Sequence, residues 1–189
     1  MPSAESVIMG KERGPVRGSR THWTLTAEAS LGEVTKPDVL VIPGGAGFIP
    51  LCNEKPVLEW VRTVHRGTTW TTSVCTGSLL LGAAGLLRGF AATIHWAARD
   101  ALGQYGARYV EEHVVPQGKI ITSAGVSSGI DMALTLVARM AGDDIAKEIQ
   151  LRIEYDPRPP FDCGAPSKAE PAVLDLVRQS IQRASAPPR

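Results

Sequence analysis

The sequence has 189 residues, 43% of them hydrophobic and 21% charged, which is enough for one well-buried domain. Its formal net charge of +1 gives no basic field that would attract nucleic acid. Gly and Pro interrupt the longest apolar stretches within ~10 residues, so none is expected to span a membrane.

Buried strands alternate with helices along the chain. Residues 38–42 (DVLVI) form an apolar run that stops at Pro43-Gly44-Gly45, which is typical of a parallel strand covered on both faces. In chain order, the expected elements are a short strand at 5–9, a hairpin arm at 21–29, a strand at 38–42, a helix at 56–66, a strand at 69–74, helices at 76–87 and 96–105, strands at 108–115 and 119–122 around a turn at 116–118, helices at 129–141 and 143–154, an irregular proline-rich stretch at 156–166, and a closing helix at 171–184.

This alternation predicts an α/β fold, an αβα sandwich whose mostly parallel sheet has helices on both faces. The sequence has no internal repeat and no long linker, so a single domain over residues 1–189 is expected. Ligands of such sheets bind outside the carboxyl ends of the strands. Both Pro43-Gly44-Gly45 and Cys75 are expected at such ends.

The cysteines indicate a reducing compartment. Cys52, Cys75 and Cys163 are an odd number without CxxC spacing, so neither a disulfide framework nor a zinc site is expected. No signal peptide opens the sequence. We therefore expect a cytoplasmic protein with free thiols.

Cys75 stands between an expected strand and an expected helix, where a sharp turn displays nucleophiles in some hydrolases. The amides of the following helix favour thiolate over thiol, so we expect a lowered pKa and the most reactive of the three thiols. Backbone amides of Thr76, Gly44 and Gly45 are expected to form an oxyanion hole beside it. The alternative is that Cys75 is a small buried core residue.

Other candidate residues are less specific. His95 precedes the helix expected at 96–105 and is either a catalytic base or a structural, hydrogen-bonded residue. The remaining histidines have no metal-binding spacing. Cys52 is expected to be a surface or half-buried thiol, and Cys163 is expected to be a bystander. The glycines at 82 and 85 match no phosphate-binding pattern and are expected to permit close packing. The histidines without such spacing are His22, His65 and His113.

Five stretches of the sequence resemble the ThiJ/PfpI superfamily, whose fold is class I glutamine amidotransferase-like, and within it the isonitrile hydratases. These stretches are DVLVIPGGAG (38–47), TSVCTGSLLLGAAGLLRG (72–89), ATIHWAARD (92–100), GVSSGIDMALTL (125–136) and IQLRIEYDPRPPFDCGAP (149–166). Cys75-Thr76 replaces the Cys-His pair of the peptidase branch, which disfavours a protease.

The resemblance implies a homodimeric enzyme that hydrates an isocyanide to an N-substituted formamide through the Cys75 thiolate, with no metal or organic cofactor. It further implies that Gly44, Gly45 and Thr76 shape the anion-stabilising site. The resemblance also implies that Gly125 and Val126 line the pocket from the opposite loop.

The resemblance also implies a departure from the family. Residues 10–18 (GKERGPVRG) resemble the segment after the family's second strand, so the first strand, its helix and the catalytic acid that they carry are expected to be missing. That strand is interior in the flavodoxin-like order 2-1-3-4-5, and a gap in the sheet is expected. Glu5, Glu12 and Asp162 are the carboxylates that would substitute for the acid. A non-catalytic domain that senses oxidants or binds a small ligand remains the alternative.

Overall fold

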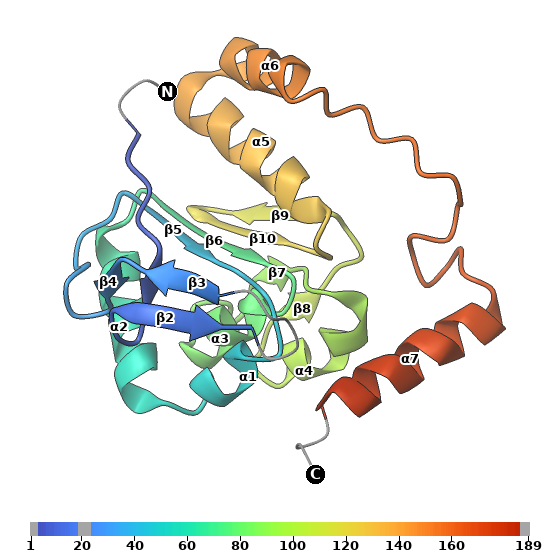
Figure 1. Ribbon diagram of the computed structural model, residues 1–189, viewed down its shortest axis with the longest axis horizontal. Coiled ribbons are helices and arrows are strands. Elements are labelled where there is room, and N and C mark those ends of the chain that lie inside the picture. Colours follow the sequence, from blue (N-terminus) through green and yellow to red (C-terminus); the bar gives the residue numbers. More distant parts are fainter. Residues whose placement is uncertain (1–3, 19–23, 186–189) are drawn as a thin grey trace. The chain divides into compact units, whose positions relative to one another are not determined.

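The computed structural model describes residues 4–18 and 24–185 and has a mixed α/β fold (Figure 1). Within this part of the chain, the main sheet has the order β5-β6-β10-β9. Its three parallel strands are β5 (Val39–Ile42), β6 (Trp70–Val74) and β10 (Ile120–Ser123), and β9 (Val114–Gln117) is antiparallel to β10. The α/β class with a mostly parallel sheet is therefore confirmed.

The hydrophobic core lies between this sheet and the helices that follow β5 and β6. α2 (Lys55–Gly67) buries Val57, Val61 and Val64, which are spaced by four and three residues and so share one helical face. α3 (Gly77–Ala83) contributes three consecutive leucines from Leu79 to Leu81. Burial of each such side chain contributes ~1.5–3 kcal/mol, so this layer fixes the position of the β6–α3 connection.

Two predicted elements are shorter than expected. The helix predicted over 76–87 is α3, which ends at Ala83 because Gly85 has a left-handed φ of 81°. Gly82 permits close packing, as predicted, since a Cβ there would lie 2.8 Å from Cδ2 of Tyr105. The helix predicted over 96–105 is a 3₁₀ turn, η1 (Trp96–Ala98), followed by α4 (Arg99–Gly103).

The strand predicted over 108–115 is two strands. β8 (Arg108–Tyr109) pairs in parallel with β7 (Ala91–Ala92), and the chain then leaves β7 to form β9. Pro116 is a residue of β9 opposite Ile121 rather than the start of a turn, because β9 is an edge strand, which tolerates a missing N–H. The turn itself contains Gly118, with a φ of 59°.

Among the described residues before position 31, two small strand pairs form. β1 (Met9–Gly10) pairs in parallel with β4 (Ala29–Ser30), and β2 (Gly14–Arg17) pairs antiparallel with β3 (Thr24–Ala27). β3 accounts for the described part of the hairpin arm predicted over 21–29. Residues 21–23, with His22, lie outside the described residues.

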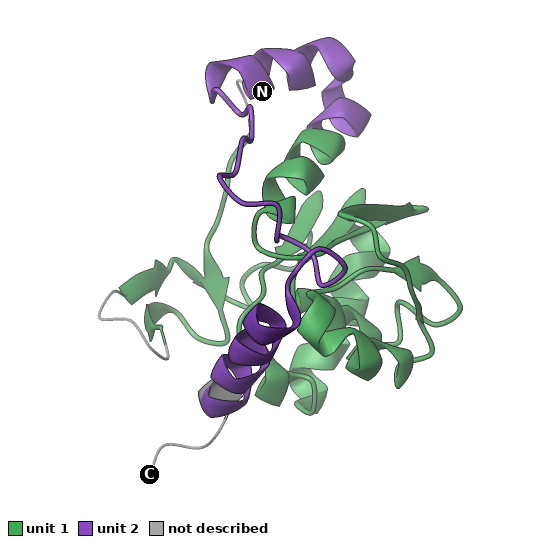
Figure 2. Ribbon diagram, turned by 90° about the vertical axis from the view of Figure 1, so that its right-hand side faces the viewer, with its two compact units in different colours: residues 1–136 green, residues 137–189 purple. Residues whose placement is uncertain are grey.

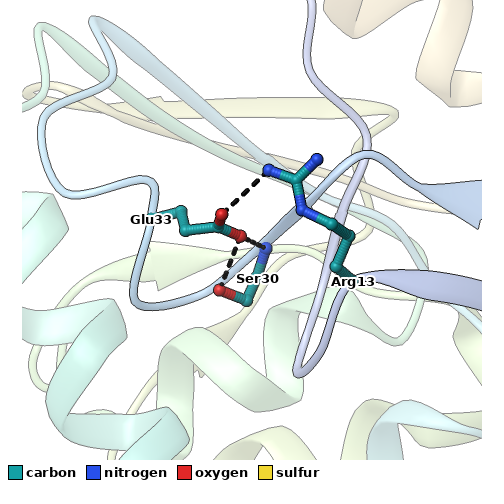
Figure 3. A network of polar contacts seen from close by, with 3 residues as sticks. All are labelled: Arg13, Ser30 and Glu33. Carbon is teal, nitrogen blue, oxygen red and sulfur yellow. Dashed lines mark hydrogen bonds and ion pairs between the residues drawn. The ribbon is translucent and has the colours of Figure 1, made fainter.

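A polar network ties the β2–β3 hairpin to the turn after β4 (Figure 3). Arg13 donates to Oε1 of Glu33 at 2.8 Å, and the backbone and hydroxyl of Ser30 donate to Oε2 at 2.8 and 2.9 Å. These hydrogen bonds, first of all that from Arg13, lower the pKa of Glu33 to about 2.

One edge of the main sheet is open within the described residues. β5 pairs with β6 alone, β1 pairs with β4 alone, and Val41 in β5 is 49% exposed. This agrees with the gap expected in the sheet.

The chain divides into two compact units, residues 1–136 and 137–189 (Figure 2). The boundary falls within α5 (Ser128–Ala141), so the second unit holds the end of that helix, α6 (Asp143–Arg152) and α7 (Pro171–Ser185). Ala146 is the one buried apolar residue among the described residues of this unit. The single domain expected over residues 1–189 stays a prediction.

Within the described residues, the helices are too short or too polar to span a membrane.

Candidate active site

Cys75 forms the sharp connection between β6 and α3. Its φ is 58°, a left-handed conformation that costs a non-glycine residue on the order of 1–3 kcal/mol and that is concentrated at functional sites. Its backbone N–H donates to the carbonyl oxygen of Ser123 at 3.0 Å, which ties the elbow to the end of β10.

Two glycines bring the loop after β5 against this elbow. A Cβ on Gly44 would lie 2.6 Å from the Cβ of Cys75, and a Cβ on Gly77 would lie 2.5 Å from the carbonyl oxygen of Ile42. Neither contact leaves room for a side chain. The Pro43-Gly44-Gly45 turn and Cys75 therefore meet at the carboxyl ends of adjacent parallel strands.

Thr76 links the two loops through its side chain. The backbone N–H of Gly45 donates to Oγ1 of Thr76 at 2.8 Å, and the Thr76 hydroxyl donates to the carbonyl oxygen of Gly45 at 3.3 Å. The Gly45 amide thus orients Thr76. The roles of Thr76, Gly44 and Gly45 in stabilising an anion stay predictions.

Burial raises the pKa of the Cys75 thiol above its usual value. Hydrogen bonding by the amide and side chain of Thr76 lowers the pKa, but by less than burial raises it. The predicted lowering of this pKa is therefore wrong, because desolvation of the thiolate outweighs the hydrogen bonds offered to it. The expectation that Cys75 is the most reactive thiol loses that physical basis.

The loop of residues 124–127 joins β10 to α5 on the far side of the elbow. Gly125 faces His95, since a Cβ on Gly125 would lie 3.8 Å from Cδ2 of that ring. Val126 is 81% exposed. Gly125 thus lies near the elbow segment, and the roles of Gly125 and Val126 in lining a pocket stay predictions.

His95 has a defined tautomer. Its Nδ1 accepts from the backbone N–H of Ala97 at 3.3 Å, so the proton of the neutral ring is on Nε2. Burial lowers the pKa of His95, which favours this neutral form. His95 caps η1, which is the structural role, and it also offers an N–H donor beside Gly125.

A buried chain of hydroxyls holds the His95 segment to the elbow. Ser78 Oγ donates to the carbonyl oxygen of Thr93 at 2.8 Å and lies 2.9 Å from Ser73 Oγ. The backbone N–H of Thr93 donates to Oγ1 of Thr122 at 2.9 Å. The sequence did not single out these residues, since isolated Ser and Thr carry no spacing signal.

The other candidates lie apart from these contacts or have other partners. Cys52 is buried in the hydrophobic core, so the expectation of a surface or half-buried thiol is wrong. Cys163 is exposed, and no cysteine is in a disulfide. Glu5 and Glu12 are exposed, and Asp162 accepts from Lys168 at 2.6 Å.

His113 and Asp131 form a contact that the sequence did not predict. Nδ1 of His113 lies 3.1 Å from Oδ2 of Asp131.

Comparisons with known proteins agree with the resemblance found in the sequence. A family model described as the DJ-1/PfpI family matches residues 3–139. The sequence is 42% identical to an isonitrile hydratase of Pseudomonas putida over 95% of this chain and 78% of that protein. It is 34% identical to the HTH-type transcriptional regulator CdhR of Pseudomonas aeruginosa over 75% of this chain and 42% of that protein.

The fold is also similar to solved structures. A ThiJ/PfpI family protein from Pseudomonas syringae superposes with a TM-score of 0.88 at 35% identity, over 95% of this chain and 74% of that one. Drosophila melanogaster DJ-1beta superposes with a TM-score of 0.68 at 25% identity, over 76% of this chain and 78% of that one.

Proposed function

The chain belongs to the DJ-1/PfpI family, and we propose that it is an isonitrile hydratase-like enzyme with Cys75 as its nucleophile. The likeness to the Pseudomonas putida hydratase extends over nearly the whole chain, which supports an enzyme. The observation that carries the proposal is the left-handed backbone of Cys75, with the loop after β5 packed against it so closely that Gly44 has no room for a side chain. A core cysteine needs neither feature.

The proposed reaction begins with attack of the Cys75 thiolate on the terminal carbon of R–N≡C. A carbon–sulfur bond forms, the carbon gains a proton, and the product is a thioimidate, R–N=CH–S–Cys75. Water then adds to that carbon, the carbon–sulfur bond breaks, and the electron pair returns to sulfur. The product is R–NH–CHO, and the sum is addition of one water, so the chemistry needs neither a metal nor an organic cofactor.

Thr76 is proposed to hold the thiolate in the direction of attack. Its amide and hydroxyl stabilise the negative sulfur before the reaction and again when the thiolate leaves. Gly44 permits the close approach of the β5 loop, and the Gly45 amide fixes the rotamer of Thr76. Gly125 and Val126 are proposed to line the substrate side.

The proton that the carbon gains is best delivered by a positioned acid, which is worth ~10²–10⁴-fold in rate. Glu5, Glu12 and Asp162 are the carboxylates that the sequence offers for this role. Asp162 is already bonded to Lys168, so Glu5 and Glu12 are the better candidates.

The working form is proposed to be a cytoplasmic homodimer. Cysteines without disulfides suit a reducing compartment. Large apolar side chains on α6 and α7 are exposed in the single chain, including Leu151 at 82% and Leu176 at 63%, and a second copy would cover them.

The proposal is tested by following formamide production from an aryl isocyanide by chromatography. We expect turnover by the native sequence and by Cys52→Ala, and none by Cys75→Ala, which should stay folded because the deletion is small. Turnover by Cys75→Ala would show that Cys75 is not the nucleophile. No turnover by the native protein would favour the alternative, a domain that senses oxidants or binds a ligand.

A further inference from the structure

His113 contacts the chain on both sides of loop 124–127. It directly precedes β9, and its carbonyl oxygen accepts from the backbone N–H of Ala124, the first residue of loop 124–127, at 2.9 Å. Its Nδ1 lies 3.1 Å from Oδ2 of Asp131, in the first turn of α5, just after the loop. One residue thus contacts both the start of the loop and the helix that follows it.

The held segment adjoins the nucleophile. Ser123, immediately before the loop, accepts the N–H of Cys75 at 3.0 Å. After the loop, Gly129 packs on the strand that carries Cys75, since a Cβ there would lie 3.3 Å from Cγ1 of Val74. Between them, Gly125 faces His95. A shift of the loop would therefore move one wall beside Cys75.

We infer that the contact between His113 and Asp131 is a clasp that positions loop 124–127 against the Cys75 elbow. Both are positioning residues for the reaction, which rests on the proposed function. The elbow has its own support in the left-handed backbone of Cys75 and in the contact with Gly44. Opening the clasp therefore weakens substrate binding and leaves the chemical step nearly unchanged.

Exposure sets the size of the effect. The side chain of His113 is 79% exposed and that of Asp131 is 32% exposed. Pairs this accessible to water are worth little, which corresponds to at most about a fivefold change in an equilibrium. The clasp is thus an adjustment of the site and not a condition for folding.

The test compares steady-state kinetics of His113→Ala, Asp131→Ala, the double variant and His113→Arg, with Glu112→Ala as the control that removes a neighbouring charge. We expect KM to rise roughly two- to fivefold in each single alanine variant and no further in the double variant, with kcat within about twofold. Arginine donates to a carboxylate but does not exchange a proton near neutral pH. His113→Arg should therefore restore KM.

A second readout does not depend on turnover. Amide hydrogen exchange of residues 124–130 should be faster in His113→Ala and return to the native rate in His113→Arg. Unchanged exchange and unchanged KM in His113→Ala would overturn the clasp, as would an arginine variant as impaired as the alanine one. A native protein that makes no formamide, yet shows this exchange pattern, would refute the proposed reaction and retain the clasp.

Discussion

At Cys75, two local features act on reactivity in opposite directions. The turn with φ of 58° presents the sulfur beside the Thr76 amide, while burial raises the pKa of the thiol. Less thiolate is present at neutral pH than in an exposed cysteine, so the proposed reaction relies on the placement of the sulfur rather than on a large thiolate fraction.

A pH profile of alkylation tests this balance. We predict that the rate of Cys75 carboxamidomethylation, followed by peptide mass spectrometry, still rises with pH beyond the usual thiol range near ~8.5. Thr76→Val removes the hydroxyl that lowers this pKa and should move the profile to higher pH, whereas Thr76→Ser should not. A rate that levels off near neutral pH would mean that the thiolate is better stabilised than burial allows.

The sequence predicted the residues of the elbow because strand ends are visible in it. An apolar run that stops at Pro43-Gly44-Gly45 and a run of strand-forming residues that stops at Cys75 imply neighbouring loops in a parallel sheet. It did not predict the sign of the pKa shift, because desolvation depends on the packing of the whole site. Nor did it connect His113 with Asp131, since their contact follows from the register of β9 with β10.

At the scale of elements, the end of β5 and the start of α3 are in close contact at Gly77. No side chain fits there, because the carbonyl oxygens of Ile42 and Pro43 would lie 2.5 and 2.8 Å from a Cβ. These are backbone atoms of a buried strand end and cannot move independently of β5.

We predict that Gly77→Ala lowers the free energy of unfolding by about 1–3 kcal/mol, measured by urea denaturation, since the strand and helix must separate. Gly47→Ala is the matched control, because Gly47 has a right-handed φ of −63° and a Cβ added there would meet nothing within 4 Å. Equal stability of the two variants would show that the β5–α3 approach is looser than described.

Element type was largely predictable from periodicity, and element ends were not. The runs that became β5 and α2 have strong apolar patterns, and the run that became β6 consists mainly of strand-forming residues; all three elements form close to the expected residues. The helix over 76–87 ended early and the strand over 108–115 divided, because a glycine conformation and a change of pairing partner decided those boundaries.

At the scale of the whole molecule, the second unit lacks a core of its own among its described residues. On α7, Val173, Leu176 and Val177 form an apolar stripe at helical spacing and are 40%, 63% and 39% exposed. Burial of such a stripe is favourable, and a second copy is the cover that we propose.

We predict that the protein has twice the 20.1 kDa mass of one chain by light scattering at micromolar concentration. Leu176→Glu should shift it toward the single-chain mass, because a charge buried in an apolar contact is costly. Gln182→Glu, on the opposite face of α7, should not. A native protein with the mass of one chain would rule out the homodimer.

The most direct test of the central claim is the mass of the protein mixed briefly with an aryl isocyanide and quenched, followed by peptide mapping. We expect one adduct, heavier than the free protein by the mass of one isocyanide, on the peptide that contains Cys75. It should disappear as formamide is released. An adduct confined to Cys52 or Cys163, or formamide production in a protein whose Cys75 is already alkylated, would contradict the claim that Cys75 is the nucleophile.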